Sequence, residues 1–144
     1  MPEETQNYQN HVRRTPMYYN LAGLILLVNI LWQGYGLIGN LSVGSVIGFL
    51  VAIALLVAAF AARTQTLIVQ NRVIRLEQRM RFQQLLPADV AARASALPIG
   101  QIVALRFACD AELPGLVNEV LAGLSDPKAI KQKVTSWQGD FLRA

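Results

Sequence analysis

The chain has 144 residues, of which 53% are hydrophobic and only 15% charged, and its formal net charge is +4. A single cysteine, Cys109, excludes an internal disulfide and a cysteine-rich metal site, and a single histidine, His11, argues against a zinc site made by one chain. The composition indicates a reducing, cytoplasm-facing compartment, and no metal or cofactor is expected.

Two apolar stretches fill most of the first half of the chain. Residues 18–38 and 43–62 are each about twenty residues long and contain no charged residue. A helix needs roughly 20 mostly apolar residues to cross about 30 Å of hydrocarbon. The sequence therefore predicts two transmembrane helices. The connector at 39–42 is so short that the helices must be antiparallel neighbours. A signal peptide is the competing interpretation, but no small-x-small cleavage site follows the first stretch.

The arginines predict the orientation of this hairpin. Arg13 and Arg14 lie before the first stretch, and the connector has no charge. The segment directly after the second stretch carries five arginines: Arg63, Arg72, Arg75, Arg79 and Arg81. Because cytoplasmic loops carry the excess of Lys and Arg, segment 1–17 and both termini are expected in the cytoplasm. The expected location is the bacterial cytoplasmic membrane, with anionic headgroups rather than nucleic acid as the counter-charge.

Each predicted span has one face suited to helix packing. On the first, five residues recur at spacings of three or four: Ala22, Leu26, Asn29, Gln33 and Gly36. On the second, Gly44, Gly48 and Ala52 form a small-xxx-small series, which lets helix backbones approach. These faces are expected to close the hairpin. The alternative is that one of them docks onto another membrane protein.

Neither span contains Asp, Glu, Lys, Arg or His. Such residues mark proton relays, ion paths and substrate sites inside membranes, so the sequence argues against a transporter, a pump or an intramembrane hydrolase. It also provides no histidine in the membrane to ligate a haem or chlorophyll. A homo-oligomeric channel or small-solute pore, with Asn29 and Gln33 lining the lumen, remains the alternative to a packing role.

Residues 63–86 are expected to continue the second helix as a cytoplasmic stalk, because Pro87 is the first residue that would end it. Val69, Val73, Leu76 and Met80 form an apolar stripe at spacings of 4, 3 and 4. The stalk is more apolar than a solvated rod should be, so packing partners are expected on more than one side. Glu77 and Arg81 are spaced for an i,i+4 ion pair.

Three arginines form a basic strip beside the apolar stripe: Arg72, Arg75 and Arg79. A solvated surface that faces lipid headgroups is the simpler interpretation. An acidic partner or nucleic acid is the sharper one, but only Phe82 is close enough to supply an aromatic contact. Nucleic-acid binding is therefore not expected.

Residues 87–144 are expected to form a small cytoplasmic helical domain. One helix should include residues from Ile99 to Phe107. A second should start at an Asp110 N-cap and reach Leu124. A third, opened by Ser125-Asp126-Pro127, should carry Ile130, Val134, Trp137 and Phe141. About sixty residues give only a marginal core, so the domain should fold back onto the stalk, the N-terminal segment or a partner.

No catalytic arrangement emerges from the sequence. Asp110, Glu112 and Asp126 lie at predicted helix starts, where capping explains them. Cys109 is expected on a helix near Phe107 as a small buried residue, without a histidine to activate it. The chain has no Walker loop, no Gly-x-Gly-x-x-Gly and no metal-spaced ligand set.

The N-terminal motif Asn7-Tyr8-x-Asn10-His11-x-Arg13, followed by two spans, resembles a bacterial family of small two-span membrane proteins of unknown function. The similarity continues through residues 69–77, 85–87, 104–108, 112–114 and 128–131. The resemblance implies this architecture and no activity. It also implies that the motif joins the N-terminal segment, stalk and helical domain into one unit, with a ligand or partner contact as the alternative.

These observations predict an all-α, non-enzymatic membrane protein: a transmembrane hairpin, a stalk extending its second helix, and a small C-terminal helical domain. The expected function is that of an accessory or scaffolding subunit, bound to other membrane subunits or to itself. A respiratory or photosynthetic complex would be one host. An enzyme acting at the membrane surface has the weakest support, because only isolated acids and one cysteine are available.

Overall fold

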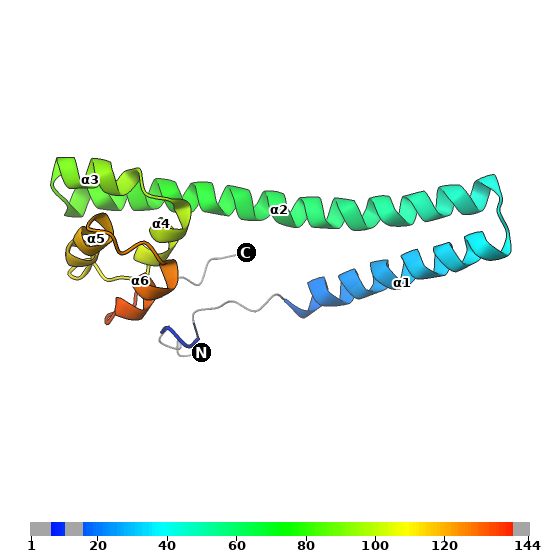
Figure 1. Cartoon of the computed structure of the whole chain (residues 1–144), viewed down its shortest axis with the longest axis horizontal. Coiled ribbons are helices and arrows are strands. Elements are labelled where there is room, and N and C mark those ends of the chain that lie inside the picture. Colours follow the sequence, from blue (N-terminus) through cyan, green and yellow to red (C-terminus); the bar gives the residue numbers. More distant parts are fainter. Residues whose placement is uncertain (1–6, 11–15, 140–144) are drawn as a thin grey trace. The chain divides into compact units, whose positions relative to one another are not determined.

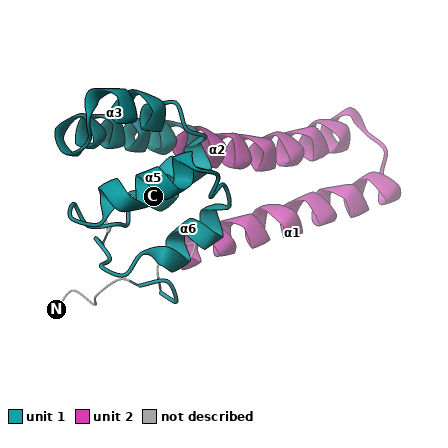
Figure 2. Ribbon diagram, turned by 60° about the vertical axis from the view of Figure 1, so that its left-hand side comes forward, with its two compact units in different colours: residues 1–13, 68–144 teal, residues 14–67 magenta. Residues whose placement is uncertain are grey.

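The computed structural model describes residues 7–10 and 16–139. It divides into two compact units, coloured separately in Figure 2. Unit 2 covers residues 14–67, and unit 1 covers residues 1–13 and 68–144. The described residues form helices, turns and loops plus one isolated bridge, so the all-α prediction, with two long apolar helices before a small helical part, is confirmed.

Unit 2 is a helical hairpin. Helix α1, Met17–Gly39, and the first part of α2, Val43–Leu85, run antiparallel (Figure 1). Ser42 and Ser45 start α2 with a reciprocal cap: the Ser42 N–H donates to Ser45 Oγ at 2.9 Å, and the Ser45 N–H donates to Ser42 Oγ at 3.2 Å. These bonds satisfy two backbone donors that a helix start leaves without partners.

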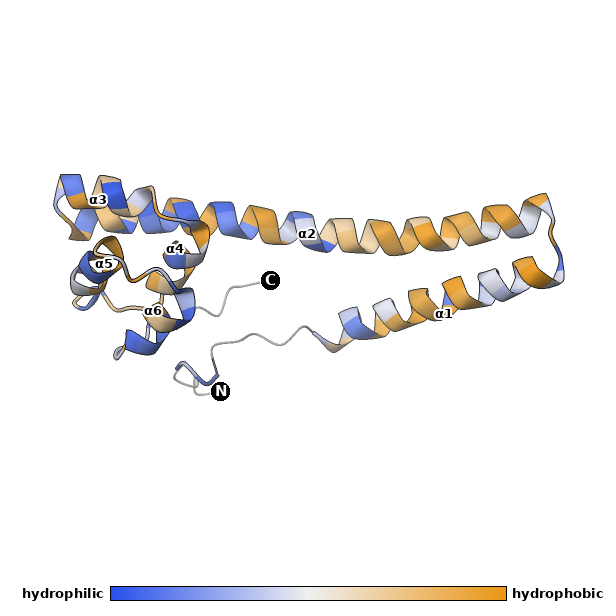
Figure 3. Ribbon diagram, viewed as in Figure 1, coloured by the Kyte–Doolittle hydropathy of each residue, from blue (hydrophilic) through white to orange (hydrophobic). Residues whose placement is uncertain are grey.

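Helix α2 continues without interruption from unit 2 into unit 1 and ends one residue before Leu86-Pro87. No proline occurs between Val43 and Leu85, and Gly44 and Gly48 both lie near its start. Proline lacks the N–H that a helix interior needs, which explains why the helix stops here. Figure 3 shows the change in composition along it, from almost continuous apolar residues to alternating apolar and polar ones.

Four short helices complete unit 1: α3 Ala88–Ser95, α4 Ile99–Leu105, α5 Leu113–Leu121 and α6 Pro127–Lys133. Proline occupies the cap or first turn of each, at Pro87, Pro98, Pro114 and Pro127. A fixed φ and a missing donor cost nothing at these positions. Asp126 caps α6 as expected, because its carboxylate accepts from the Lys128 and Ala129 N–H groups, each at 3.2 Å.

The core of unit 1 lies between the end of α2 and the short helices. Phe82 of α2 and Leu86, the residue that follows α2, pack with residues of every short helix, and Phe82 is fully buried. Four alanines also belong to the core, Ala91, Ala94, Ala104 and Ala108, and their small side chains leave room for close packing. The short helices therefore pack on the stalk, which is one of the three partners expected for so small a domain.

Several local predictions for residues 99–137 are wrong. Helix α4 ends at Leu105, so Phe107 lies in the following turn, where it is fully buried. Cys109 is not helical, and its N–H donates to the Ser136 carbonyl at 3.1 Å. Buried turn residues have the same apolar spacing as a helix face, and no glycine or proline between 101 and 113 marks the break.

Helices α5 and α6 also differ from their predicted bounds. Asp110 does not cap α5, which begins at Leu113 after Glu112. Helix α6 ends at Lys133, so Val134 and Trp137 follow it, and Phe141 lies outside the described residues. Trp137 instead forms an isolated antiparallel bridge with Ala108, and the Gln138 N–H donates to the Phe107 carbonyl at 2.7 Å. This pairing takes over the backbone groups that a longer α6 would use.

Candidate interaction surfaces

The hairpin of unit 2 closes where Gln33 of α1 meets Gly48 of α2. A Cβ added at Gly48 would lie 3.0 Å from Gln33 Oε1, and one added at Gly34 would lie 3.4 Å from the ring of Phe49. Ala52, one turn beyond Gly48, is 1% exposed. Small residues thus let one amide of α1 approach α2, which is the packing expected between helices in lipid.

The other predicted packing residues are placed differently. Asn29 is half-buried on the same helix as Gln33. Gly36 and Gly44 are exposed, and a Cβ at Gly36 would meet nothing within 4 Å. The half-buried line on α1 contains Gly23, Leu26 and Leu37 instead of Ala22 and Gly36. Gly36 and Gly44 therefore stay candidates for contacts outside this hairpin.

Gly48→Leu should destabilise the hairpin by about 1–3 kcal/mol, because the longer side chain has to displace Gln33 from the contact. Gly36→Leu is the matched control, since that position has open space around it. Thermal unfolding of the detergent-solubilised protein, followed by the helical circular-dichroism signal, measures both variants. Equal loss in the two would show that the Gln33–Gly48 contact does not hold the hairpin.

The described part of the N-terminal motif forms a turn that contacts α6. The Asn7 N–H donates to Asn10 Oδ1 at 2.6 Å, while Asn7 Oδ1 accepts from the N–H groups of Gln9 and Asn10. Tyr8 presents its hydroxyl to Gln132 Nε2 at 3.2 Å. The two asparagines shape the turn, and the tyrosine between them reaches the helical part. His11 and Arg13 lie outside the described residues.

Arg81, near the end of α2, forms hydrogen bonds to the loop after α4. Its Nε donates to Asp110 Oδ1 at 2.8 Å, and its Nη2 donates to the Ala108 carbonyl at 2.6 Å. Nη1 reaches the Arg106 carbonyl at 3.3 Å. The planar fork of arginine explains how one side chain serves a carboxylate and two carbonyls. Arg81 thus points to Asp110, and not to Glu77 as its spacing suggested.

Glu112 holds the chain that follows α6. Its carboxylate accepts from the N–H of Thr135 at 3.0 Å, the hydroxyl of Thr135 at 2.8 Å and the N–H of Ser136 at 2.9 Å. Burial by itself would raise the pKa of Glu112, but the hydrogen bonds from Ser136 and Thr135 outweigh it and lower the pKa below its ordinary 4.5. The ionised carboxylate of Glu112 therefore has a structural role, because it holds Thr135 and Ser136 in place.

A lowered pKa in the folded state gives stability that is present above pH 4.5 and is lost as the pH falls through the folded value. Unit 1 should therefore lose stability on acidification below pH 4.5, and Glu112→Gln should reduce both its stability at neutral pH and this pH dependence. Urea unfolding at a series of pH values measures the effect. Glu119→Gln is the control, because its ion pair with Lys133 is half exposed. If the stability of Glu112→Gln depended on pH as the unmodified protein does, Glu112 would not be the source of the pH dependence.

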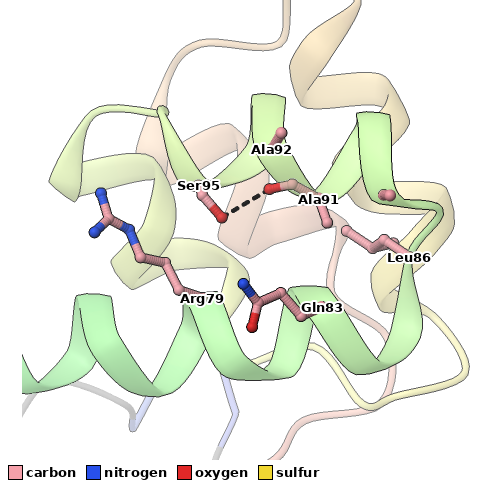
Figure 4. A pocket seen from close by; sticks show the side chains of 7 residues that line it. Arg79, Gln83, Leu86, Ala91, Ala92 and Ser95 are labelled. Atoms are coloured by element: carbon pink, nitrogen blue, oxygen red, sulfur yellow. Dashed lines mark hydrogen bonds between the residues drawn. The ribbon is translucent and has the colours of Figure 1, made fainter.

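Of the three arginines in the basic strip, Arg79 also lines a pocket. Arg72 and Arg79 are exposed and Arg75 is half-buried. Figure 4 shows Arg79 and Gln83 of α2 opposite Ala91 and Ser95 of α3, around a pocket of about 460 Å³. The Ser95 hydroxyl is already engaged, because it donates to the Ala91 carbonyl at 2.7 Å. The pocket thus offers one cation and one amide among alanine and leucine side chains.

Both long helices are long and apolar enough to cross a membrane. Among residues 7–10 and 16–139, no group of three or more His, Cys, Asp or Glu residues is placed to hold a metal ion. No curated protein and no solved structure matches the chain. The model of the Family of unknown function (DUF6526) matches residues 1–144, and the chain belongs to that family.

Proposed function

We propose that the protein is a non-catalytic, multi-pass protein of the bacterial cytoplasmic membrane and an accessory or scaffolding subunit of a larger membrane assembly. The observation that carries the proposal is the distribution of side chains in unit 2. Large apolar side chains such as Leu24, Leu31 and Leu50 are 58%, 66% and 59% exposed, whereas Gln33 lies against Gly48. Lipid is the environment that such a surface suits.

A scaffolding role is supported by the use of charged groups in unit 1. Arg81 pairs with Asp110, Glu112 accepts from residues 135 and 136, and Asp126 caps α6. Each of these acids has a structural contact that explains its position without chemistry. Asp110, Glu112 and Asp126 therefore stabilise loops and a helix start in unit 1.

The proposed topology places the N- and C-termini in the cytoplasm and the connector on the opposite side, because arginines flank the hairpin and none lies in the connector. Single cysteines at two exposed serines test it in a Cys109→Ala background. Ser42→Cys in the connector should react with a membrane-impermeant maleimide in spheroplasts. Ser125→Cys should react only after permeabilisation. The reverse labelling pattern would refute the orientation.

The subunit role predicts other membrane proteins at fixed stoichiometry after purification in a gentle detergent. Mass spectrometry of the intact complex identifies them. A lone, monodisperse monomer would contradict the proposal.

A variant that combines Asn29→Leu with Gln33→Leu distinguishes a channel from a scaffold. A pore that uses these amides should lose flux in proteoliposomes. A scaffold should show no flux before or after the change and should lose packing stability instead, at about 0.6–2 kcal/mol per amide. Flux in the unmodified protein that disappears in the double variant would favour the channel.

A further inference from the structure

The part of α2 that belongs to unit 1 has one packed face and one open face. Ile74, Gln78 and Phe82 are buried against the helical part, with 5%, 7% and 0% exposed. On the opposite face lie four apolar residues, the stalk stripe, which are 48–61% exposed: Val69, Val73, Leu76 and Met80. In the part of the chain that the structure describes, this second apolar face is therefore not covered by the core of unit 1.

The stalk stripe has the spacing of a coiled-coil seam. Its steps of 4, 3 and 4 residues place Val69 and Leu76 at d positions and Val73 and Met80 at a positions of a heptad. A β-branched residue at a with leucine at d is the combination that favours two parallel strands. Val73 and Leu76 are such a pair at the centre of the stripe.

The two edges of the stalk stripe differ in charge. The g positions are Arg72 and Arg79, and both are exposed. The e position between them is Glu77, which is also exposed. In a parallel two-stranded coiled coil, a g residue meets the e residue of the other strand five positions later. Arg72 and Glu77 are five residues apart, so the stripe carries both halves of a self-complementary contact.

We propose that a second copy of this chain covers the stalk stripe in a parallel, in-register, two-stranded coiled coil. Val73 and Leu76 form its centre, and Arg72 pairs with Glu77 of the partner subunit on each side of the two-fold axis. The parallel direction rests on the proposed function, because copies inserted in one membrane with one orientation have their α2 helices pointing the same way. The interface is isologous, as in most homodimers.

The charge pattern selects a second copy over a lipid surface. Anionic headgroups would attract Arg72 and Arg79 but would repel Glu77 on the other edge. A second copy uses both edges. The seam is short, and confinement of both helices to one membrane raises their effective concentration, which offsets its small size.

Disulfide cross-linking in native membrane vesicles tests the proposal in a Cys109→Ala background. Val73→Cys lies on the seam, and Asn71→Cys is the matched control, two residues away at an f position and also exposed. Under mild oxidation, Val73→Cys should form a covalent homodimer at least about tenfold faster than Asn71→Cys, because a disulfide needs Cβ atoms about 4 Å apart. Equal rates, no dimer, or a cross-link to a different polypeptide would overturn the proposal.

Charge exchange tests the pairing itself. In the Val73→Cys chain, Arg72→Glu or Glu77→Arg alone should slow cross-linking about fivefold, because each single change places like charges together twice. The double exchange should restore the rate. A double variant as slow as the single ones would overturn the Arg72–Glu77 pairing.

Failure of this inference and failure of the proposed function give different results. If the serine labelling supports the topology but Val73→Cys does not cross-link, only the dimer is refuted. If Val73→Cys cross-links and the labelling pattern is reversed, the orientation is refuted and the dimer stands.

Discussion

Phe82→Ala should destabilise unit 1 by about 3–5 kcal/mol, the loss typical of a large core side chain replaced by alanine. Phe82 is fully buried and belongs to the cluster that joins α2 to the short helices. The loss combines the removed apolar surface with the cavity left between these elements. Since small domains have a total stability of about 5–15 kcal/mol, this loss is a large fraction of the stability of unit 1.

Urea unfolding of the detergent-solubilised protein, followed by Trp137 fluorescence in a Trp32→Phe background, measures this loss. Phe60→Ala is the matched control, because Phe60 lies on the same helix and is 68% exposed. It should change the stability of unit 1 little. A similar loss in both variants would show that the short helices do not depend on α2 for their core.

Arg81→Ala should have the second-largest effect, a loss of about 2–4 kcal/mol, because it removes several hydrogen bonds at once and leaves two carbonyls without their donor. The Arg81 side chain is 14% exposed, so water replaces these bonds poorly. Arg81→Lys should recover only part of the stability, since an ammonium cannot reach Asp110 and the carbonyls with the geometry of the guanidinium.

Two further variants separate the bonds of Arg81. Asp110→Asn should cost less than Arg81→Ala, because the Asp110 side chain is 66% exposed and the carbonyl bonds remain. Arg79→Ala, at an exposed position two residues earlier, should change stability by less than about 1 kcal/mol. The same fluorescence-detected unfolding measures both. If Arg79→Ala matched Arg81→Ala, the loss would reflect helix charge and not the contacts to the loop.

The N-terminal motif shows what a family resemblance adds to residue patterns. No periodicity links Asn7 and Asn10 to a structure, yet their spacing of three suits a turn closed by side-chain oxygens. The contact between Tyr8 and Gln132 joins residues 124 positions apart. Such a contact leaves no local signal in the sequence, so only the family motif pointed to this tyrosine.

In the stalk, too, the sequence pattern predicted some features and the tertiary structure decided others. Its apolar residues predicted packing on more than one side, but their spacing did not say which face meets the helical part. Ile74 and Phe82 turn out to be buried, whereas Val73 and Leu76 are exposed. Arg81 was one of several basic residues in a row, and nothing local separated it from Arg79. Its loop partners are 25 to 29 residues away.

The sequence by itself determined the two long apolar helices, the end of the second just before Pro87 and the cap at Asp126, because length, hydropathy and proline act locally. Tertiary structure decided the ends of α4, α5 and α6, the roles of Asp110 and Glu112, and which face of α2 is buried. These features depend on hydrogen bonds and packing between distant segments. Such contacts override the helical periodicity of Phe107 and Trp137, because a buried backbone group must find a partner wherever the fold provides one.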